Sequence, residues 1–239
     1  MSKILTVTIP SYNTEKYIDE CLPYLIDERI ISDIEILIVS DGSIDNTVSV
    51  AQKWADKYPD SIRVIDKENG GHGSTINRGI LEATGKYFKV VDGDDWVVTE
   101  NFVKLIEFLK GVDVDLINNP YFEHDEETAD ETLMMALKIQ ANQIVQHDKI
   151  IEQIKIPPMH TITYRTSILK DNKISIDEKM FYVDVAANLE RRVDARAEND
   201  RSELSGLAGR IMHRQGDFRR SQIGRQIQWK VNLRAGACP

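Results

Sequence analysis

The sequence is poor in cysteine and has no long apolar run. Only Cys21 and Cys238 occur among its 239 residues, at opposite ends of the chain. Such a pair supplies neither a disulfide framework nor a zinc knuckle, so we expect a reducing compartment. No run approaches the roughly 18 apolar residues of a membrane span. The apolar run at 4–9 stops at Pro10 without a small-residue cleavage site, unlike a signal peptide. These absences predict a cytoplasmic protein.

Positive charge is scarce before residue 190 and abundant after it. Residues 1–190 carry 19 Lys and Arg against 34 Asp and Glu, a net charge of −15, whereas residues 191–239 carry 11 against 5, a net charge of +6. The whole chain therefore has a net charge of −9. An acidic body lacks the basic face that nucleic-acid phosphates require, which argues against nucleic acid as a partner.

The basic segment 191–239 differs from the rest of the chain, because ten of its eleven cations are arginine whereas lysine predominates before it. We weigh two interpretations. In one, the segment is a solvated basic arm that makes peripheral contact with anionic lipid at the inner face of a membrane. In the other, it is not the native C-terminus, as a reading-frame shift near residues 186–190 would cause.

Strand and helix patterns alternate through the first half of the chain. Apolar, β-branched runs predict five strands, at 3–9, 34–39, 61–65, 86–91 and 113–118. Helical periodicity predicts four helices, at about 14–25, from about 45, at 76–81 and at 99–109. Strict alternation predicts an α/β fold with a mostly parallel sheet covered on both faces.

The pattern weakens after residue 118. The acidic stretch 123–131 predicts a solvated loop, and 144–155 reads as either strand or helix. Residues 159–169 predict a strand leading into a helix, and 180–190 predict a short helix.

Small, polar and acidic residues follow four of the predicted strands. They are Pro10–Asn13, Asp41–Ser43, Asn69–Gly73 and Asp92–Asp95. In an open parallel sheet, ligands bind outside the carboxyl ends of the strands, so these four segments predict a binding site. The glycines at 70–73 lack the G-x-G-x-x-G spacing of dinucleotide sites, and no P-loop signature occurs.

The segment Asp92-Gly93-Asp94-Asp95 is the strongest candidate for chemistry. On an extended backbone, carboxylates at i and i+2 point the same way, and glycine between them allows a ligand to approach closely. Clustered hard oxygens suit Mg²⁺ or Mn²⁺ held together with substrate phosphates. The alternative is a turn whose aspartates cap the next helix.

Two further residues have both a binding and a structural interpretation. Asp41 either accepts hydrogen bonds from a nucleotide base or ribose, or caps the helix that begins near Asp45. His72 either contacts a phosphate or is simply solvated, as most loop histidines are.

Four segments together resemble the family 2 glycosyltransferases, which have a three-layer α/β/α GT-A nucleotide-sugar fold. The segments are 9–13 (IPSYN), 39–43 (VSDGS) with 45–47 (DNT), 70–79 (GGHGSTINRG) and 91–95 (VDGDD). Each motif alone is weak, but their order and their places at successive strand ends make the combination specific. The resemblance covers residues 1–118 strongly and 155–190 more faintly.

The resemblance implies transfer of one sugar from a nucleotide donor, usually a UDP-sugar, with inversion at the anomeric carbon. The implied cofactor is Mn²⁺ or Mg²⁺, and the implied acceptor is a hydroxyl of a saccharide or lipid-linked saccharide in surface polysaccharide or glycolipid synthesis. The membrane helices and complete Q-x-x-R-W motif of processive members are missing, so we expect a non-processive hexosyltransferase.

The resemblance also implies roles for residues near the nucleotide. By position, Pro10, Tyr12 and Asn13 border the nucleotide, and Asn77 and Arg78 lie near the nucleotide or the diphosphate.

At the strand ends, the same resemblance implies that Asp41 binds the nucleotide base and that Asp92 contacts the ribose or the sugar. Gly93 allows the donor to approach, and Asp94 holds the metal.

Inverting transfer needs a base that takes the proton from the attacking hydroxyl. The family supplies a carboxylate late in its catalytic domain, and the matching stretch here is Met180–Asp184. We therefore nominate Asp184 as the general base, with a helix-surface aspartate as the alternative. His160 lies in a segment that resembles the acceptor side of the family, where it contacts acceptor or phosphate or is a structural histidine.

We accordingly divide the chain into a GT-A catalytic domain at 1–190 and a basic tail at 191–239. Within the domain, 1–118 is the nucleotide-sugar half and 119–190 the acceptor half. Two other functions compete with sugar transfer. One is a nucleotide-sugar-binding protein without turnover, and the other is an aspartyl phosphotransferase that uses the Asp92-x-Asp94 motif.

Overall fold

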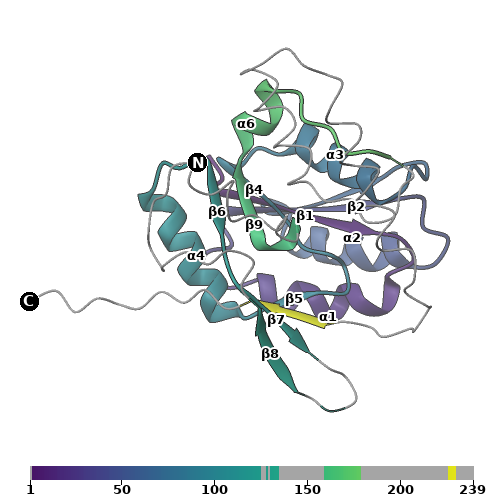
Figure 1. Cartoon of the computed structure of the whole chain (residues 1–239). Coiled ribbons are helices and arrows are strands. Elements are labelled where there is room, and N and C mark those ends of the chain that lie inside the picture. The colour runs from purple at the N-terminus through teal and green to yellow at the C-terminus, as the bar shows by residue number, and fades with distance from the viewer. Residues whose placement is uncertain (1, 125–127, 129, 135–158, 179–225, 230–239) are drawn as a thin grey trace, which may run out of the picture.

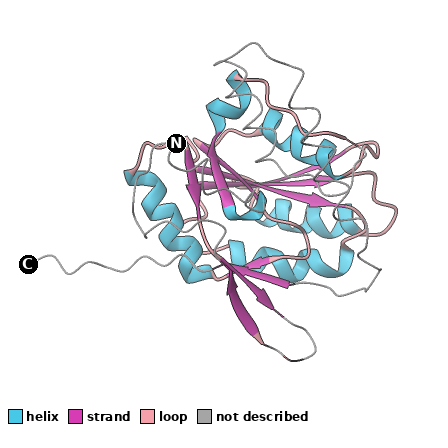
Figure 2. Cartoon of the chain, in the orientation of Figure 1, coloured by secondary structure: helices cyan, strands magenta, loops and turns pink. Residues whose placement is uncertain are grey.

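The computed structural model describes residues 2–124, 128, 130–134, 159–178 and 226–229. Helices cover both faces of a central sheet, which gives three layers (Figure 1). Figure 2 shows the strands of that sheet between the two layers of helices. This is the α/β/α arrangement that alternating strand and helix patterns predict.

The central sheet has six strands in the order β3-β2-β1-β4-β9-β6. Their bounds are β1 Leu5–Ser11, β2 Ile34–Ser40, β3 Ile62–Asp66, β4 Tyr87–Val90, β6 Leu116–Asn118 and β9 Ile162–Arg165. Strands β1 to β4 are parallel, and β9 is antiparallel to both of its neighbours. The prediction of a mostly parallel sheet is therefore confirmed.

The helices pack against the two faces of this sheet. Their bounds are α1 Glu15–Leu25, α2 Thr47–Lys57, α3 His72–Glu82, α4 Thr99–Gly111 and α6 Thr166–Asp171. Ile18, Ala51 and Ile106 bring α1, α2 and α4 into one buried core, and Ile76 and Leu169 bring α3 and α6 into a second.

Strand β4 supplies side chains to both cores. Tyr87 belongs to the core beneath α1, α2 and α4, and Phe88 belongs to the core beneath α3 and α6. This follows from the alternation of side chains across a strand. Strands buried on both faces read as continuous apolar runs, which is why the sequence reveals them clearly.

Strand β9 lies between β4 and β6 although it is far from both in sequence. Tyr87 of β4 pairs with Arg165, and Ile117 of β6 pairs with Thr163. A 3-10 turn, η1 Met159–Thr161, precedes β9, and α6 follows it. The predicted strand leading into a helix at 159–169 is thus confirmed. Because β9 is antiparallel to β4, η1 lies at the carboxyl end of β4.

A smaller sheet has the strand order β5-β10-β7-β8. Its strands are β5 Trp96–Val97, β7 Tyr121–His124, β8 Glu131–Met134 and β10 Gln226–Trp229. The prediction of a loop at 123–131 is wrong at both ends of that segment, because those residues belong to β7 and β8, which pair antiparallel. Strand β10 falls within the predicted basic tail, and its backbone pairs with β5 and β7.

Strand β1 continues through Pro10, where the sequence suggested that it ends. Strand β4 pairs with β1 only as far as Thr8, so the missing N–H of proline breaks no ladder with β4. The segments 144–155 and 180–190 lie outside the described residues. Among the described helices, none combines the length and hydropathy needed to cross a bilayer.

Candidate functional site

The candidate site lies at the carboxyl edge of β1, β2, β3 and β4. Parallel pairing brings the ends of β1 and β2 side by side, with Ser11 opposite Ser40. Three segments with special backbone geometry follow these strands. They contain Asn13 (φ 55°), Gly42 (φ 71°) and Gly71 (φ 86°), all in the left-handed region. The loops therefore turn sharply and stay close to the sheet, which is where the sequence predicted ligand binding.

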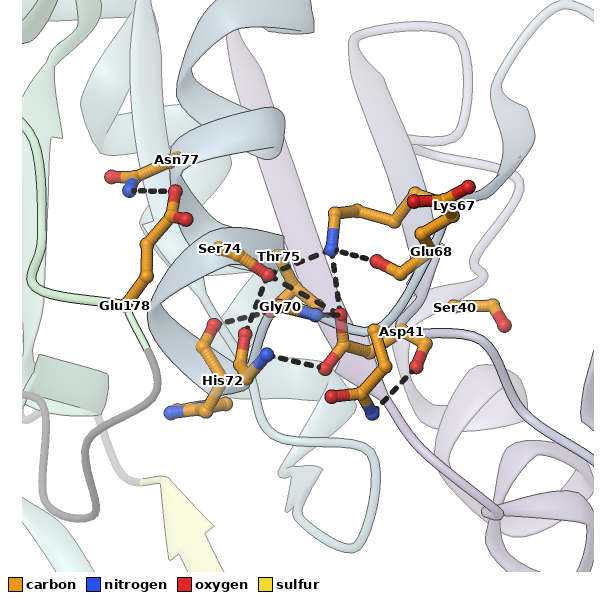
Figure 3. A network of polar contacts seen from close by, with 12 residues as sticks. Ser40, Asp41, Lys67, Glu68, Gly70, His72, Ser74, Thr75, Asn77 and Glu178 are labelled. Atoms are coloured by element: carbon orange, nitrogen blue, oxygen red, sulfur yellow. Dashed lines mark hydrogen bonds and ion pairs between the residues drawn. The ribbon is translucent and has the colours of Figure 1, made fainter.

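Asp41 is the centre of a hydrogen-bond network between the end of β2 and the loop before α3 (Figure 3). Its Oδ1 accepts from Lys67 Nζ at 2.6 Å and from Gly70 N at 2.9 Å. Its Oδ2 accepts from Gly71 N at 2.8 Å. The hydroxyl of Ser74 donates to Oδ1 at 3.2 Å. The carboxylate therefore holds the glycine loop and the start of α3 against the sheet.

The electrostatics of Asp41 agree with this geometry. Burial alone would raise the pKa of Asp41, but the Lys67 ammonium and the backbone N–H groups of Gly70 and Gly71 hold it below its ordinary value. Asp41 is therefore ionised at neutral pH. Neither of its two sequence interpretations included the role that the structure gives it, as the acceptor for a neighbouring loop.

The loop between β1 and α1 brings three predicted nucleotide neighbours to the same edge. Pro10 is buried in β1, and Tyr12 is 51% exposed. Asn13 Oδ1 accepts a hydrogen bond from Ile44 N at 2.9 Å, which joins this loop to the segment after β2. A Cβ on Gly93 would lie 3.2 Å from the Pro10 carbonyl oxygen, so glycine permits the close approach of these two segments.

The segment after β4 forms a turn in which Asp95 N donates to the Asp92 carbonyl at 3.0 Å. The expectation that Asp92 and Asp94 point the same way assumed an extended backbone. In the turn, the carboxylates of Asp92 and Asp95 come together instead. Asp94 is the exposed residue of the turn, but surrounding atoms take part of the water from its carboxyl group, and this loss and the charge of Asp92 raise its pKa.

Asp92 also contacts the start of α3. His72 Nε2 lies 3.0 Å from Asp92 Oδ1. Burial would lower the pKa of His72, but the hydrogen bond and the charge of Asp92 raise it above its ordinary value. In the same way, His72 holds the pKa of Asp92 down against the effect of burial. His72 is thus a partner of Asp92, where the sequence suggested a phosphate contact or a solvated side chain.

A third group, His160 of η1, completes a cluster with Asp92 and Asp95. One ligand atom from each residue lies within 4.8 Å of the others. Burial lowers the pKa of His160 to about 4, so its imidazole is neutral near pH 7 and able to bind a metal. Two carboxylate oxygens and one neutral imidazole nitrogen are a suitable donor set for Mn²⁺ and an acceptable one for Mg²⁺.

A pocket of about 410 Å³ opens beside this turn. Its walls are the outer face of α1 and the residues that follow Asp92, and it is lined by Tyr17, Asp19, Glu20, Cys21, Pro23, Tyr24, Asp94, Asp95 and Trp96. Tyr17 and Tyr24 are 45% and 46% exposed. Aromatic faces beside carboxylates suit a polyhydroxylated ring, because the ring stacks on the aromatics while its hydroxyls donate to the oxygens.

A buried lysine lies directly behind the turn. Lys89 of β4 is 1% exposed, and its Nζ donates to the Asn119 side-chain oxygen at 3.2 Å and to the His160 carbonyl at 2.8 Å. Burial lowers the pKa of Lys89 to about 7. Sequence reasoning missed this residue, although a lysine within the apolar run 86–91 was visible.

Asn77 and Arg78 lie on α3 but not at the carboxylate cluster. Asn77 donates from Nδ2 to the Ile176 carbonyl at 2.9 Å and accepts from Ile176 N at 2.7 Å through Oδ1. Arg78 is paired with Glu82 one turn along the helix, at 2.7 Å. The predicted base, Asp184, lies outside the described residues.

Sequence comparison identifies relatives of this chain. The model of the Glycosyl transferase family 2 matches residues 6–172. An uncharacterized glycosyltransferase of Bacillus subtilis, EpsJ, is 33% identical over 155 residues, which cover 65% of this chain and 44% of EpsJ. The minor teichoic acid biosynthesis protein GgaB of the same species is 29% identical over 180 residues, covering 72% of this chain and 19% of GgaB. The chain thus spans less than half the length of these relatives.

Solved structures share the fold. S. aureus TarS 1–349, in complex with UDP-GlcNAc, superimposes with a TM-score of 0.62 at 24% identity, covering 79% of this chain and 53% of that chain. The mannosyltransferase PcManGT from Pyrobaculum calidifontis, in complex with GDP-Man and Mn²⁺, superimposes with a TM-score of 0.55 at 16% identity. The superposition covers 80% of this chain and 52% of that chain.

Proposed function

The chain belongs to the Glycosyl transferase family 2, and from that premise we propose that it moves one sugar from a nucleotide-diphosphate sugar to a hydroxyl of a saccharide acceptor. We propose UDP as the nucleotide, inversion at the anomeric carbon, and a role in surface polysaccharide or glycolipid synthesis. The TarS complex with UDP-GlcNAc supports the choice of UDP, and the name of GgaB supports a role in surface polysaccharide synthesis, whereas inversion follows from the family resemblance alone.

The observation that carries the proposal is the arrangement at the carboxyl edge of the sheet. The loop held by Asp41 follows β3 and the turn at Asp92–Asp95 follows β4, so both lie at the same edge of the sheet, and His72 links them through its contact with Asp92. A nucleotide placed along this edge would have its base near Asp41 and its diphosphate near the carboxylate turn. Tyr12 is exposed at the same edge and available to pack against the base.

A divalent cation fits the cluster of Asp92, Asp95 and His160, with Asp94 beside it. When bound there, Mn²⁺ or Mg²⁺ would neutralise the charge that develops on the leaving diphosphate. The Mn²⁺ in the PcManGT complex supports this choice of cofactor. The carboxylates supply the negative charge that holds the ion, and neutral His160 adds a nitrogen ligand without adding charge.

We place the acceptor at the pocket between α1 and the turn, because Asp94 and Asp95 line both the pocket and the proposed donor site. Tyr24 and Trp96 would stack on the acceptor ring. Asp184 remains our proposal for the general base, which takes the proton of the attacking hydroxyl.

Binding and turnover together test this function. Calorimetric titration of UDP-GlcNAc, GDP-Man and dTDP-glucose, each with and without Mn²⁺, should identify one donor whose affinity rises with the metal. Asp94→Ala should weaken metal-dependent donor binding at least tenfold, and Asp184→Asn should keep binding but lose transfer. Asp66→Asn, an exposed residue at the end of β3, is the matched control.

Three results would contradict the proposal in different ways. Full activity of Asp94→Ala would remove Asp94 from the metal site, as would full activity of Asp95→Ala for the cluster of Asp92, Asp95 and His160. Donor binding with no transfer to any acceptor pool would favour the nucleotide-sugar-binding protein. A phosphoaspartate trapped on Asp92 would favour the phosphotransferase.

A further inference from the structure

Lys89 joins three segments that are distant in sequence. It extends from β4 toward the residues after β6 and toward η1. Its ammonium donates to the Asn119 side-chain oxygen at 3.2 Å and to the backbone carbonyl of His160 at 2.8 Å. The side chain is 1% exposed. Lys89 therefore connects β4, which leads into the turn at Asp92–Asp95, to η1, which contains His160.

A buried ammonium is an expensive way to hold a fold together. Removing a cation from water costs several kcal/mol, and well-packed apolar residues often replace buried charges with no loss of stability. The neighbours of Lys89 in β4, Phe88 and Val90, are apolar and fully buried, as a central strand requires. The position of Lys89 next to the candidate metal site suggests a role at that site.

The second contact of interest is made by His160 itself. Its ring packs edge-on against Tyr121 with centroids 4.9 Å apart, and its ligating nitrogen lies within 4.8 Å of the carboxylate oxygens of Asp92 and Asp95. Tyr121 restrains the ring, while Lys89 restrains the backbone carbonyl of the same residue. Together these contacts restrict where the imidazole nitrogen lies relative to the two carboxylates.

We propose that Lys89 is a positioning residue of the metal site, which fixes the imidazole of His160 at the distance from Asp92 and Asp95 that a divalent cation requires. This rests on the proposed function, in which that cluster holds Mn²⁺ or Mg²⁺. Lys89 does not touch the ion. It acts through the backbone of η1, as groups that orient metal ligands commonly do.

Two effects of Lys89 would change the affinity for Mn²⁺ in opposite directions. In its protonated form Lys89 would repel a divalent cation, so by electrostatics alone its replacement by a neutral residue would make Mn²⁺ bind more tightly. Loss of the tie to His160 would make Mn²⁺ bind more weakly. The direction of the change in affinity therefore separates positioning from simple electrostatics.

The experiment is a double-mutant cycle measured by calorimetric titration of MnCl₂ into nucleotide-free protein. Lys89→Met should weaken Mn²⁺ binding about 10- to 100-fold, the usual effect of removing a group that orients a metal ligand. His160→Ala should weaken it at least as much. Adding Lys89→Met to His160→Ala should cause no further loss of affinity, because the residue through which Lys89 acts is gone.

Two controls separate positioning from damage to the fold. Lys86→Met removes a half-exposed lysine of the same segment, which contacts the Val112 carbonyl and Asp113, and should leave Mn²⁺ affinity unchanged. The metal-free unfolding temperature of Lys89→Met should stay within a few degrees of the wild type. Should Lys89→Met fail to fold, Lys89→Gln keeps a donor of shorter reach and is expected to give the same loss in a milder form.

Unchanged or tighter Mn²⁺ binding by Lys89→Met would overturn the inference while leaving the proposed metal site intact. An equal loss in the His160→Ala background would also overturn it, because Lys89 would then act without His160. A wild-type protein that binds neither Mn²⁺ nor Mg²⁺ would refute the metal site of the proposed function, and this inference with it.

Discussion

At the scale of single residues, Asp41 shows how one side chain can organise a binding edge. Its two oxygens accept from the side chain of Lys67, from two backbone N–H groups and from Ser74. A carboxylate that receives several donors is strongly held in its ionised form. The shape of the glycine loop, and hence of any nucleotide site beside it, depends on this one acid.

Asp41→Asn should lower the free energy of unfolding by about 2–3 kcal/mol at pH 7, because one carboxylate oxygen becomes an NH₂ group that faces donors. The pKa of Asp41 is lowered in the folded protein, so its contribution is present above the ordinary aspartate pKa of about 3.9 and is lost as pH falls through the folded value. The difference in the free energy of unfolding between wild type and variant should therefore disappear below about pH 4. Urea titrations at several pH values measure this difference, with Asp66→Asn as the control. A difference that does not depend on pH would contradict a stabilising role of the ionised Asp41 carboxylate.

Sequence reasoning singled out the acids at the strand ends but not the side chains that contact them. Asp41 and Asp92 follow buried strands, and parallel pairing of β1, β2 and β4 suffices to bring such strand ends together. Lys67, His72 and Lys89 become partners only through the exact course of loops. The turn at 92–95 is the clearest case, because it brings Asp95 rather than Asp94 to Asp92.

At the scale of elements, α3 links the candidate site to the segment that leads toward Asp184. Its first residue, His72, contacts Asp92. One and a half turns later, Asn77 pairs with both backbone polar groups of Ile176, much as a neighbouring strand would. The resemblance predicted Asn77 and Arg78 near the nucleotide, and the structure adds a bond between Asn77 and Ile176 that their separation in sequence concealed. That nucleotide role itself stays a prediction.

Asn77→Ala should release residues 174–178 from α3 while leaving the helix formed. Loss of these hydrogen bonds should speed exchange of the Ile176 amide hydrogen roughly 5- to 30-fold, because each of the two bonds contributes about 1 kcal/mol. Hydrogen exchange followed by mass spectrometry measures this. Arg78→Ala, which removes only the exposed pair with Glu82, is the control. Equal exchange in both variants would show that Asn77 does not hold this segment.

At the scale of the whole molecule, β9 makes the two predicted halves depend on each other. Residues 1–118 contain most of the recognised motifs, which suggested a nucleotide-binding half. In the structure, however, β9 separates β4 from β6, and its Ile162 and Tyr164 complete the core beneath α3. The order of strands in a sheet is a long-range property, so local patterns predicted β9 as an element but not its place.

A fragment of residues 1–118 should therefore fail to fold cooperatively, although it carries Asp41 and Asp92. Without β9, the edge of β4 is unpaired and Phe88 and Val90 lose part of their buried environment. A fragment of residues 1–178 restores both and should unfold in one cooperative urea transition. Circular dichroism of the two fragments makes the comparison, and a cooperative transition in the shorter one would establish an independent half.

The position of β9 also has a consequence for synthesis on the ribosome. About 70 residues separate the end of β4 from the start of β9. At a synthesis rate of roughly 5–20 residues per second, the edge of β4 stays unpaired for about 4–14 s before β9 has been made. During that interval the nascent chain exposes an unpaired strand edge and part of an apolar core. We therefore expect chaperones to bind the nascent chain while residues 90 to 165 are being synthesised. Codon choice in this stretch would then set how long the nascent chain remains vulnerable.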